Sequence, residues 1–212
     1  MNDNDAIKEY ADIAYEITQK HCFNKEYDVE RYHNVYYPEI HIAWQKIPLL
    51  IDMMQKKQTT HGYIVWIDSD AFFNKDTTFS LDDFLPTGSK WVTLSEDIQR
   101  YECGEYGLSI NTGVMIFRIC NESIQFLWDL LNRYKHEGWP FFEQGGIIQM
   151  IQNQLITLRD INFVPYNTLQ TFPHAVDQVK YMFNPGALVY HFPGSSKEER
   201  IKRFTDIYEQ LK

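Results

Sequence analysis

The sequence has few cysteines, few glycines and few prolines. Among its 212 residues there are three cysteines, Cys22, Cys103 and Cys120, which lie far apart and never form a Cys-x-x-Cys pair. This spacing indicates reduced thiols in a cytosol-like compartment, so we expect a cytoplasmic protein. Ten glycines and eight prolines are too few to indicate a long flexible or low-complexity region.

Positive charge is also scarce. The chain has 20 Lys and Arg against 29 Asp and Glu, a formal net charge of −9, and no basic run. This balance argues against nucleic acid or an anionic membrane as the main partner, and a phosphorylated substrate would need a metal ion to bind here. The N-terminus lacks the basic and apolar regions of a signal peptide, and no apolar run approaches the roughly 18 residues of a membrane span. We therefore expect a soluble protein.

What is present is a regular alternation of helical and strand patterns along one domain, residues 1–212. Apolar residues at helical spacing predict helices over 5–20, 47–54 and 124–134, one that starts near Glu143, and one after a Ser195–Glu198 capping box. Apolar or alternating runs predict strands at 26–35, 63–68, 90–97, 113–119 and 187–192. The fold class is therefore α/β, with a central, mostly parallel sheet flanked by helices.

Acidic residues end two of these strands, and a histidine ends a third. Asp68 and Asp70 follow the first of them, Glu96 and Asp97 end the next, and His191 ends the last. Ligands bind at the carboxyl ends of strands in such sheets, and buried carboxylates are costly unless they are paired or bound to metal. Oxygen ligands with one imidazole suit Mn²⁺ or Mg²⁺ better than Zn²⁺. The alternative is that Asp68 caps the following turn and Asp70 is solvated.

The segment after His191 suits a phosphate. Pro193-Gly194-Ser195-Ser196-Lys197 precedes the last helix, whose free backbone N–H groups and neighbouring lysine could hold a metal-bound diphosphate. The alternatives are a buried structural histidine and a solvated Lys197. The sequence contains neither a P-loop nor a Gly-x-Gly-x-x-Gly motif.

Four motifs carry a family resemblance. WIDSDAFF, INTGVMIFR, FFEQGG and HFPGSSK stand in the order that is typical of retaining glycosyltransferases of the GT-A fold. The sequence resembles the family of fungal α-galactosyl/α-mannosyltransferases and plant xyloglucan xylosyltransferases, and more distantly the glycogenin and bacterial α-galactosyltransferase group. WQKIPLLIDMM resembles the family's Trp-x-Lys helix, and the match spans roughly residues 40 to 200. The size resembles compact glycosyltransferase domains of bacteria or of large DNA viruses of algae, including a chlorella-virus one.

The resemblance implies a metal and diphosphate site. Asp70 and His191 would ligate Mn²⁺, and Asp68 would ligate it or hold the ribose or the donor sugar. Gly194 and Lys197 match residues that hold the diphosphate.

The resemblance also implies a sugar site. Asp97 matches an acid that contacts donor-sugar hydroxyls, Asn111 matches an amide near the sugar, and Glu143 and Gln144 match an Asp-Gln pair beside the anomeric carbon. Lys46 and Trp44 are further candidates on the donor side. An aromatic wall for the acceptor would come from Tyr106, Tyr166, Phe172 and His174.

Simpler roles exist for each of these polar residues. Glu143 and Gln144 suit the first turn of a helix, Asn111 suits a turn, and Asp97 suits a strand-end cap. The sequence also departs from the family. Glu143 replaces the usual Asp, no strand is visible before the first helix to help bind the nucleotide base, and the relatives' membrane anchor is not seen.

From these residues we expect a Mn²⁺-dependent hexosyltransferase that uses a UDP-sugar, UDP-glucose or UDP-galactose, and transfers the sugar with retention to a glycan or other hydroxyl acceptor. One rival is a metal-dependent phosphoryl-transfer enzyme, although DSDAFF lacks the Thr or Val that a phosphatase with an aspartyl nucleophile would carry. The other is a sugar-nucleotide- or glycan-binding module without turnover.

Overall fold

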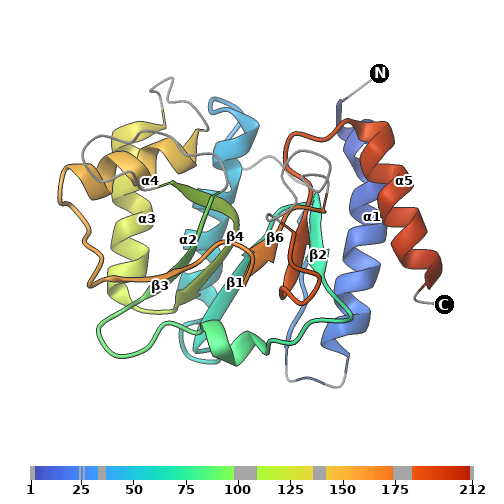
Figure 1. The fold of residues 1–212 in the computed structure, drawn as a ribbon. Helices are drawn as coiled ribbons and strands as arrows, with labels where there is room; N and C mark the ends of the chain where they lie inside the picture. Colours follow the sequence, from blue (N-terminus) through green and yellow to red (C-terminus); the bar gives the residue numbers. More distant parts are fainter. Residues whose placement is uncertain are drawn as a thin grey trace. The chain divides into compact units, whose positions relative to one another are not determined.

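The computed structural model describes residues 3–23, 25, 27–32, 37–97, 109–135, 142–173 and 183–210. These form two compact units, each with its own sheet (Figure 1). Unit 1 comprises Met1–Tyr32, Ile67–Ser80 and Asn167–Lys212, and unit 2 comprises His33–Trp66 and Leu81–Tyr166. Neither unit is a continuous stretch of chain.

Unit 2 contains a four-stranded sheet with the order β1-β4-β3-β5. Its strands are β1 (Tyr63–Ile67), β3 (Val92–Glu96), β4 (Ile110–Arg118) and β5 (Ile161–Val164). Strand β3 is parallel to β5 and antiparallel to β4, with a bulge between Leu94 and Ser95. The helices are α2 (Lys46–Lys57), α3 (Asn121–Tyr134) and α4 (Glu143–Gln152), with short 3₁₀ turns η1 (Ile42–Gln45) and η2 (Leu81–Phe84).

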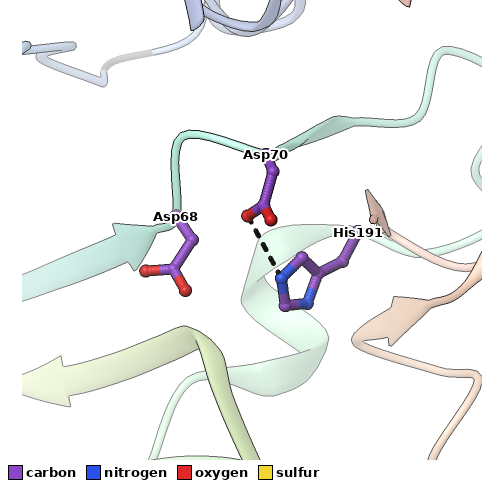
Figure 2. A group of neighbouring side chains, drawn as sticks. All are labelled: Asp68, Asp70 and His191. Atoms are coloured by element: carbon purple, nitrogen blue, oxygen red, sulfur yellow. Dashed lines mark ion pairs between the residues drawn. The ribbon is translucent and has the colours of Figure 1, made fainter. Parts of the chain in front are cut away.

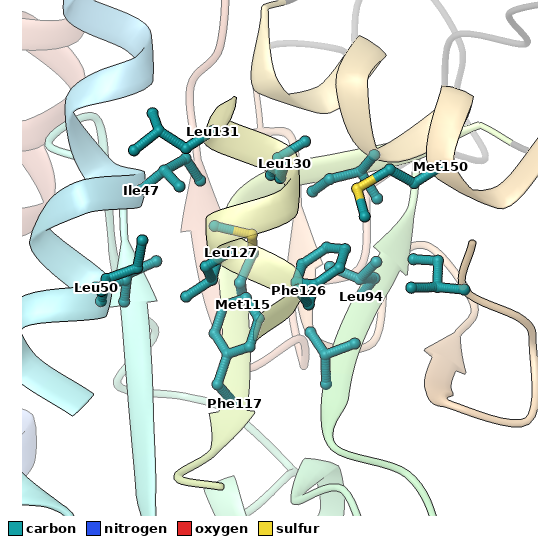
Figure 3. Packing of buried hydrophobic residues seen from close by; sticks show 14 of the residues in the cluster. Ile47, Leu50, Leu94, Met115, Phe117, Phe126, Leu127, Leu130, Leu131 and Met150 are labelled. Atoms are coloured by element: carbon teal, nitrogen blue, oxygen red, sulfur yellow. The ribbon is translucent and has the colours of Figure 1, made fainter. Parts of the chain in front are cut away.

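The core of unit 2 lies where its helices meet β3 and β4 (Figure 3). Helix α3 contributes Phe126, Leu127, Leu130 and Leu131, whose spacing places them on one face of the helix. Their neighbours from the other elements include Ile47, Leu50, Leu94, Met115, Phe117 and Met150. This packing holds the start of α4 against β4, which positions the polar residues described below.

Unit 1 contains a three-stranded sheet with the order β2-β7-β6. Its strands are β2 (Ala71–Phe73), β6 (Gln170–Thr171) and β7 (Val189–His191). Strand β7 is antiparallel to β2 and parallel to β6. Helices α1 (Asp3–Cys22) and α5 (Lys197–Gln210) pack against each other, with Tyr10, Phe72, Phe192 and Phe204 buried among them.

The α/β class is confirmed, but two details differ from the sequence prediction. Both sheets are mixed rather than mostly parallel, because β2–β7 and β3–β4 are antiparallel pairs. The strand expected at 26–35 is not formed in its described part, 27–32, which has no regular structure. None of the described helices is both long enough and apolar enough to cross a membrane. The thiols of Cys22 and Cys120 are free, and Cys103 lies outside the described residues.

Candidate functional site

Three side chains from unit 1 form a cluster that could hold a metal ion (Figure 2). Asp68 directly follows β1, Asp70 directly precedes β2, and His191 ends β7. One ligand atom from each lies within 4.8 Å of the others. The structure thus brings together the three residues that the sequence grouped, and their binding of a metal ion stays a prediction.

The reason they meet differs from the one the sequence suggested. Asp70 does not sit at the carboxyl end of a parallel strand; it stands at the amino end of β2, where the antiparallel register places Ala71 opposite His191. The backbone N–H of Phe192 donates to the Asp70 carbonyl oxygen at 3.0 Å, which holds the two chain segments together. Glu96 and Asp97, at the end of β3, belong to unit 2 instead.

Asp70 is held as a carboxylate. Burial on its own would raise the pKa of the Asp70 carboxyl, but the facing His191 and the Arg200 guanidinium outweigh burial and lower the pKa to about 2. The distances are 3.3 Å from Asp70 Oδ1 to His191 Nε2 and 2.8 Å from Oδ2 to Arg200 Nη2. Arg200 comes from α5 and also donates from Nε to the Phe192 carbonyl oxygen. A negative oxygen ligand is therefore present at any physiological pH.

His191 is buried, but it is not merely a packed core histidine. Its Nδ1 lies 2.9 Å from Oε1 of Gln170 on β6, and its ring lies against Phe172, with the centroids 5.6 Å apart. The opposite ring nitrogen, Nε2, faces Asp70. Two carboxylates and one imidazole are a donor set that fits Mn²⁺ or Mg²⁺.

The segment after His191 leads into α5. Gly194 adopts a φ of +71°, in the left-handed region, and a Cβ added there would meet no atom of the described residues within 4 Å. The helix cap is Ser196, not the predicted Ser195, because Ser196 Oγ accepts from the backbone N–H of Glu199. Lys197 is not simply solvated, since its Nζ lies 3.8 Å from a carboxylate oxygen of Glu9 on α1.

A second polar cluster lies in unit 2, around a buried ion pair. Lys46 Nζ lies 2.9 Å from Glu143 Oε1, and the two side chains are only 8% and 5% exposed. Thr112 donates its hydroxyl to the same Glu143 oxygen at 2.9 Å. Glu143 Oε2 is buried and has no hydrogen-bond partner among the described residues. Glu143 is therefore bound into the core of unit 2.

Gln144 lies in a different set of contacts. Its Nε2 and Asn111 Nδ2 both approach Asp97 Oδ2, at 3.4 and 3.3 Å. Asn111 Oδ1 in turn accepts from the backbone N–H of Gly113. The structure thus brings together Asp97, Asn111 and Gln144, as the resemblance implied for a sugar site.

Two aromatic candidates are core residues instead. Trp44 and Phe172 are each 1% exposed, packed in the cores of units 2 and 1, so neither can contact a sugar. Tyr166 is partly buried, while Tyr106 and His174 lie outside the described residues. The sequence could not separate an aromatic residue of the core from one that lines a binding site, because the same residue types occur in both places.

Comparison with solved structures identifies the fold of this chain. No protein-family model matches the sequence, and no curated protein matches it. The crystal structure of a glycosyltransferase involved in the glycosylation of the major capsid of PBCV-1 is similar, with a TM-score of 0.70 at 18% identity over 93% of this chain and 92% of that chain. The chain therefore shares the fold of that glycosyltransferase. The GT-A α/β architecture that the motifs predicted is thereby confirmed.

A second solved structure is more distant. Apo mouse xyloside xylosyltransferase 1 has a TM-score of 0.44 at 13% identity, covering 89% of this chain and 73% of that chain. The fold assignment therefore depends on the first structure.

Sequence reasoning missed three residues of these clusters. Arg200 and Gln170 hold Asp70 and His191, and Thr112 holds Glu143. Only Thr112 stood inside a quoted motif, INTGVMIFR. Arg200 looks like one more charge on the polar face of a helix, and no sequence signal distinguishes it.

Proposed function

We propose that this chain is a metal-dependent glycosyltransferase that moves a hexose from a UDP-sugar to a hydroxyl group of a glycan or other acceptor. The observation that carries the proposal is the Asp68–Asp70–His191 cluster within a fold shared with a glycosyltransferase. Asp68, Asp70 and His191 would hold Mn²⁺, with Mg²⁺ as the alternative. When bound, the ion would neutralise the charge that develops on the leaving diphosphate.

The loop and helix after His191 would hold the rest of the diphosphate. Gly194 lets the backbone approach closely, and the first free N–H groups of α5 attract an anion. Lys197 Nζ lies 3.8 Å from a carboxylate oxygen of Glu9, and it would exchange this partner for a phosphate oxygen.

The sugar would be held by Asp97, Asn111 and Gln144. Their amide and carboxylate groups already contact one another, which is the pattern expected of groups that bind several hydroxyls. Of the two residues that resemble the family's Asp-Gln pair, Gln144 is the better candidate to face the anomeric carbon. Glu143 already pairs with Lys46 and Thr112, so we assign both Glu143 and Lys46 a positioning role.

In the transfer, the bond between the anomeric carbon and the diphosphate oxygen breaks, and UDP leaves with the bonding electrons. The acceptor oxygen forms the new bond to the anomeric carbon and passes its proton to an oxygen of the departing diphosphate. Positive charge develops on the sugar ring, and an amide oxygen beside it stabilises that charge. Retention of configuration is the outcome that the family resemblance favours.

The test is Asp70→Asn, which keeps the shape of the side chain but removes its charge. We expect UDP-glucose or UDP-galactose to bind the wild-type protein with MnCl₂ and not with EDTA, in calorimetric titration. With an acceptor supplied, UDP release should fall about 100-fold or more in Asp70→Asn, since the loss of a metal ligand costs several kcal/mol of transition-state stabilisation.

Asp76→Asn is the control, because Asp76 is an exposed carboxylate in the same unit. Full activity of Asp70→Asn, or UDP-sugar binding that ignores EDTA, would contradict the proposal. Binding without transfer to any acceptor would favour a binding module, and release of inorganic phosphate would favour a phosphoryl-transfer enzyme.

A further inference from the structure

Gln170 is buried completely, yet half of its amide group has no partner in the part of the chain that the structure describes. Its side chain lies on β6, next to β7, with an exposed fraction of 0%. Nε2 of Gln170 makes no hydrogen bond with any described residue. An unpaired donor in the core costs free energy that an apolar side chain of the same size would not.

The other half of the amide makes one contact, and it is with a metal-ligand candidate. Gln170 Oε1 lies 2.9 Å from Nδ1 of His191, and both groups are buried. Since an amide oxygen can only accept, the imidazole must carry a proton on Nδ1 in this arrangement. A neutral His191 then presents a lone pair on Nε2, 3.3 Å from Asp70 Oδ1.

Without that acceptor the imidazole would favour the other tautomer. The proton would move to Nε2, where the Asp70 carboxylate is a ready acceptor. A metal ion would then have to displace a proton from the nitrogen that it needs. The orientation of the Gln170 amide therefore decides whether Nε2 of His191 offers a lone pair to a cation or carries a proton instead.

We propose that Gln170 is a positioning residue that holds His191 in the Nδ1–H tautomer, so that Nε2 is available to the metal ion. The proposal deepens the proposed function and rests on it, because it concerns the same metal site. It accounts for a polar residue kept in the core with an unpaired donor.

The experiment compares Gln170→Met with Gln170→Glu. Methionine keeps the length of the side chain but removes the acceptor, while glutamate keeps an acceptor for Nδ1–H. Free Mn²⁺ is counted by electron paramagnetic resonance as MnCl₂ is titrated into each protein with saturating UDP. We expect the dissociation constant for Mn²⁺ to rise about 10- to 100-fold in Gln170→Met and to stay within about threefold in Gln170→Glu.

A second readout needs no metal ion. Long-range ¹H–¹⁵N spectra of the metal-free wild-type protein should show His191 protonated on Nδ1, and those of Gln170→Met should show it protonated on Nε2. Gln45→Met is the matched control, since Gln45 is also a buried glutamine but bonds to backbone groups in unit 2. It should leave both Mn²⁺ affinity and the His191 tautomer unchanged.

The outcomes separate this proposal from the proposed function. Wild-type Mn²⁺ affinity in Gln170→Met, or an Nε2–H tautomer in the wild-type protein, overturns the role of Gln170 and leaves the transferase intact. Failure of the wild-type protein to bind Mn²⁺ overturns both. A loss in Gln45→Met equal to that in Gln170→Met would mean that any buried substitution disturbs the site, and it would overturn the specific role.

Discussion

At the residue scale, the two candidate clusters handle buried charge in different ways. Asp70 has a nitrogen-bearing side chain at each oxygen, His191 on one side and Arg200 on the other, and it remains partly open. Glu143 has Lys46 and Thr112 at one oxygen and no partner among the described residues at the other, and it is almost fully enclosed. Glu143 is therefore enclosed in the core of unit 2, whereas the Asp70 carboxylate keeps some exposure, which the proposed metal site needs.

The Lys46–Glu143 pair leads to a double-mutant prediction. Lys46→Met and Glu143→Gln should each lower the free energy of unfolding by about 3 kcal/mol, because each leaves one buried charge without its partner. The double variant should be less destabilised than the sum of the two, by about 2 kcal/mol, since neither charge is then left alone. Urea unfolding of the four proteins measures the coupling. Additive losses would show that the two side chains do not interact.

At the element scale, short strands and tight helix contacts position the sites. Strand β7 has three residues, and its antiparallel pairing with β2 is what brings His191 to Asp70. Helix α4 can bring Gln144 to Asp97 only because it packs closely on its neighbours. Gly146, in the first turn of α4, is the residue at which the helix lies close to these neighbours.

Gly146→Ala tests this packing. Alanine is normally favoured over glycine in a helix by up to about 1 kcal/mol. Here the added Cβ would lie 2.8 Å from Leu130 Cδ1, 3.1 Å from the Trp44 ring and 3.2 Å from Tyr134 Cβ. We therefore expect a loss of about 1–3 kcal/mol in the free energy of unfolding.

The control for Gly146→Ala is Gly62→Ala, where an added Cβ meets nothing within 4 Å. Both variants are compared with the wild-type protein by urea unfolding. Equal stability of the two variants would contradict the close packing of α4.

At the scale of the whole molecule, global unfolding should respond to acid through His21. This residue, on α1, stacks on Phe73 with ring centroids 4.4 Å apart, and Lys25 Nζ donates to its Nε2 at 2.7 Å. Burial, and then the positive charge of Lys25, lower the pKa of the His21 imidazole from 6.5 to about 4. The folded protein therefore keeps His21 neutral where the unfolded chain would protonate it.

This pKa shift predicts a loss of stability as pH falls from about 6.5 toward 4, because the unfolded state binds the extra proton in that window. Since the ring is only half-buried, solvent screening reduces the effect to about 1 kcal/mol between pH 7 and pH 5. His21→Phe keeps the aromatic stack but has no group that titrates. Its free energy of unfolding should therefore fall less over the same pH range. Thermal unfolding at a series of pH values measures this difference, with His61→Phe as control. An identical pH profile for His21→Phe and the wild-type protein would refute the prediction.

The sequence alone predicted most of the helices and strands, which depend on local pattern. Helical spacing placed α2, α3 and α5, apolar runs placed β1, β3 and β4, and the DSD and HFPGSSK motifs identified the metal-ligand candidates. These features follow from the periodicity of side chains along one element, which neighbouring residues determine by themselves.

The tertiary structure decided which residues meet across the chain. The antiparallel register of β2 and β7, the pairing of Glu143 with Lys46 and the contact of Gln170 with His191 all join segments far apart in sequence. Burial likewise decided that Phe172 is a core residue. Such contacts depend on how elements pack and on which partner satisfies a buried polar group. Neither can be predicted from the sequence pattern of a single element.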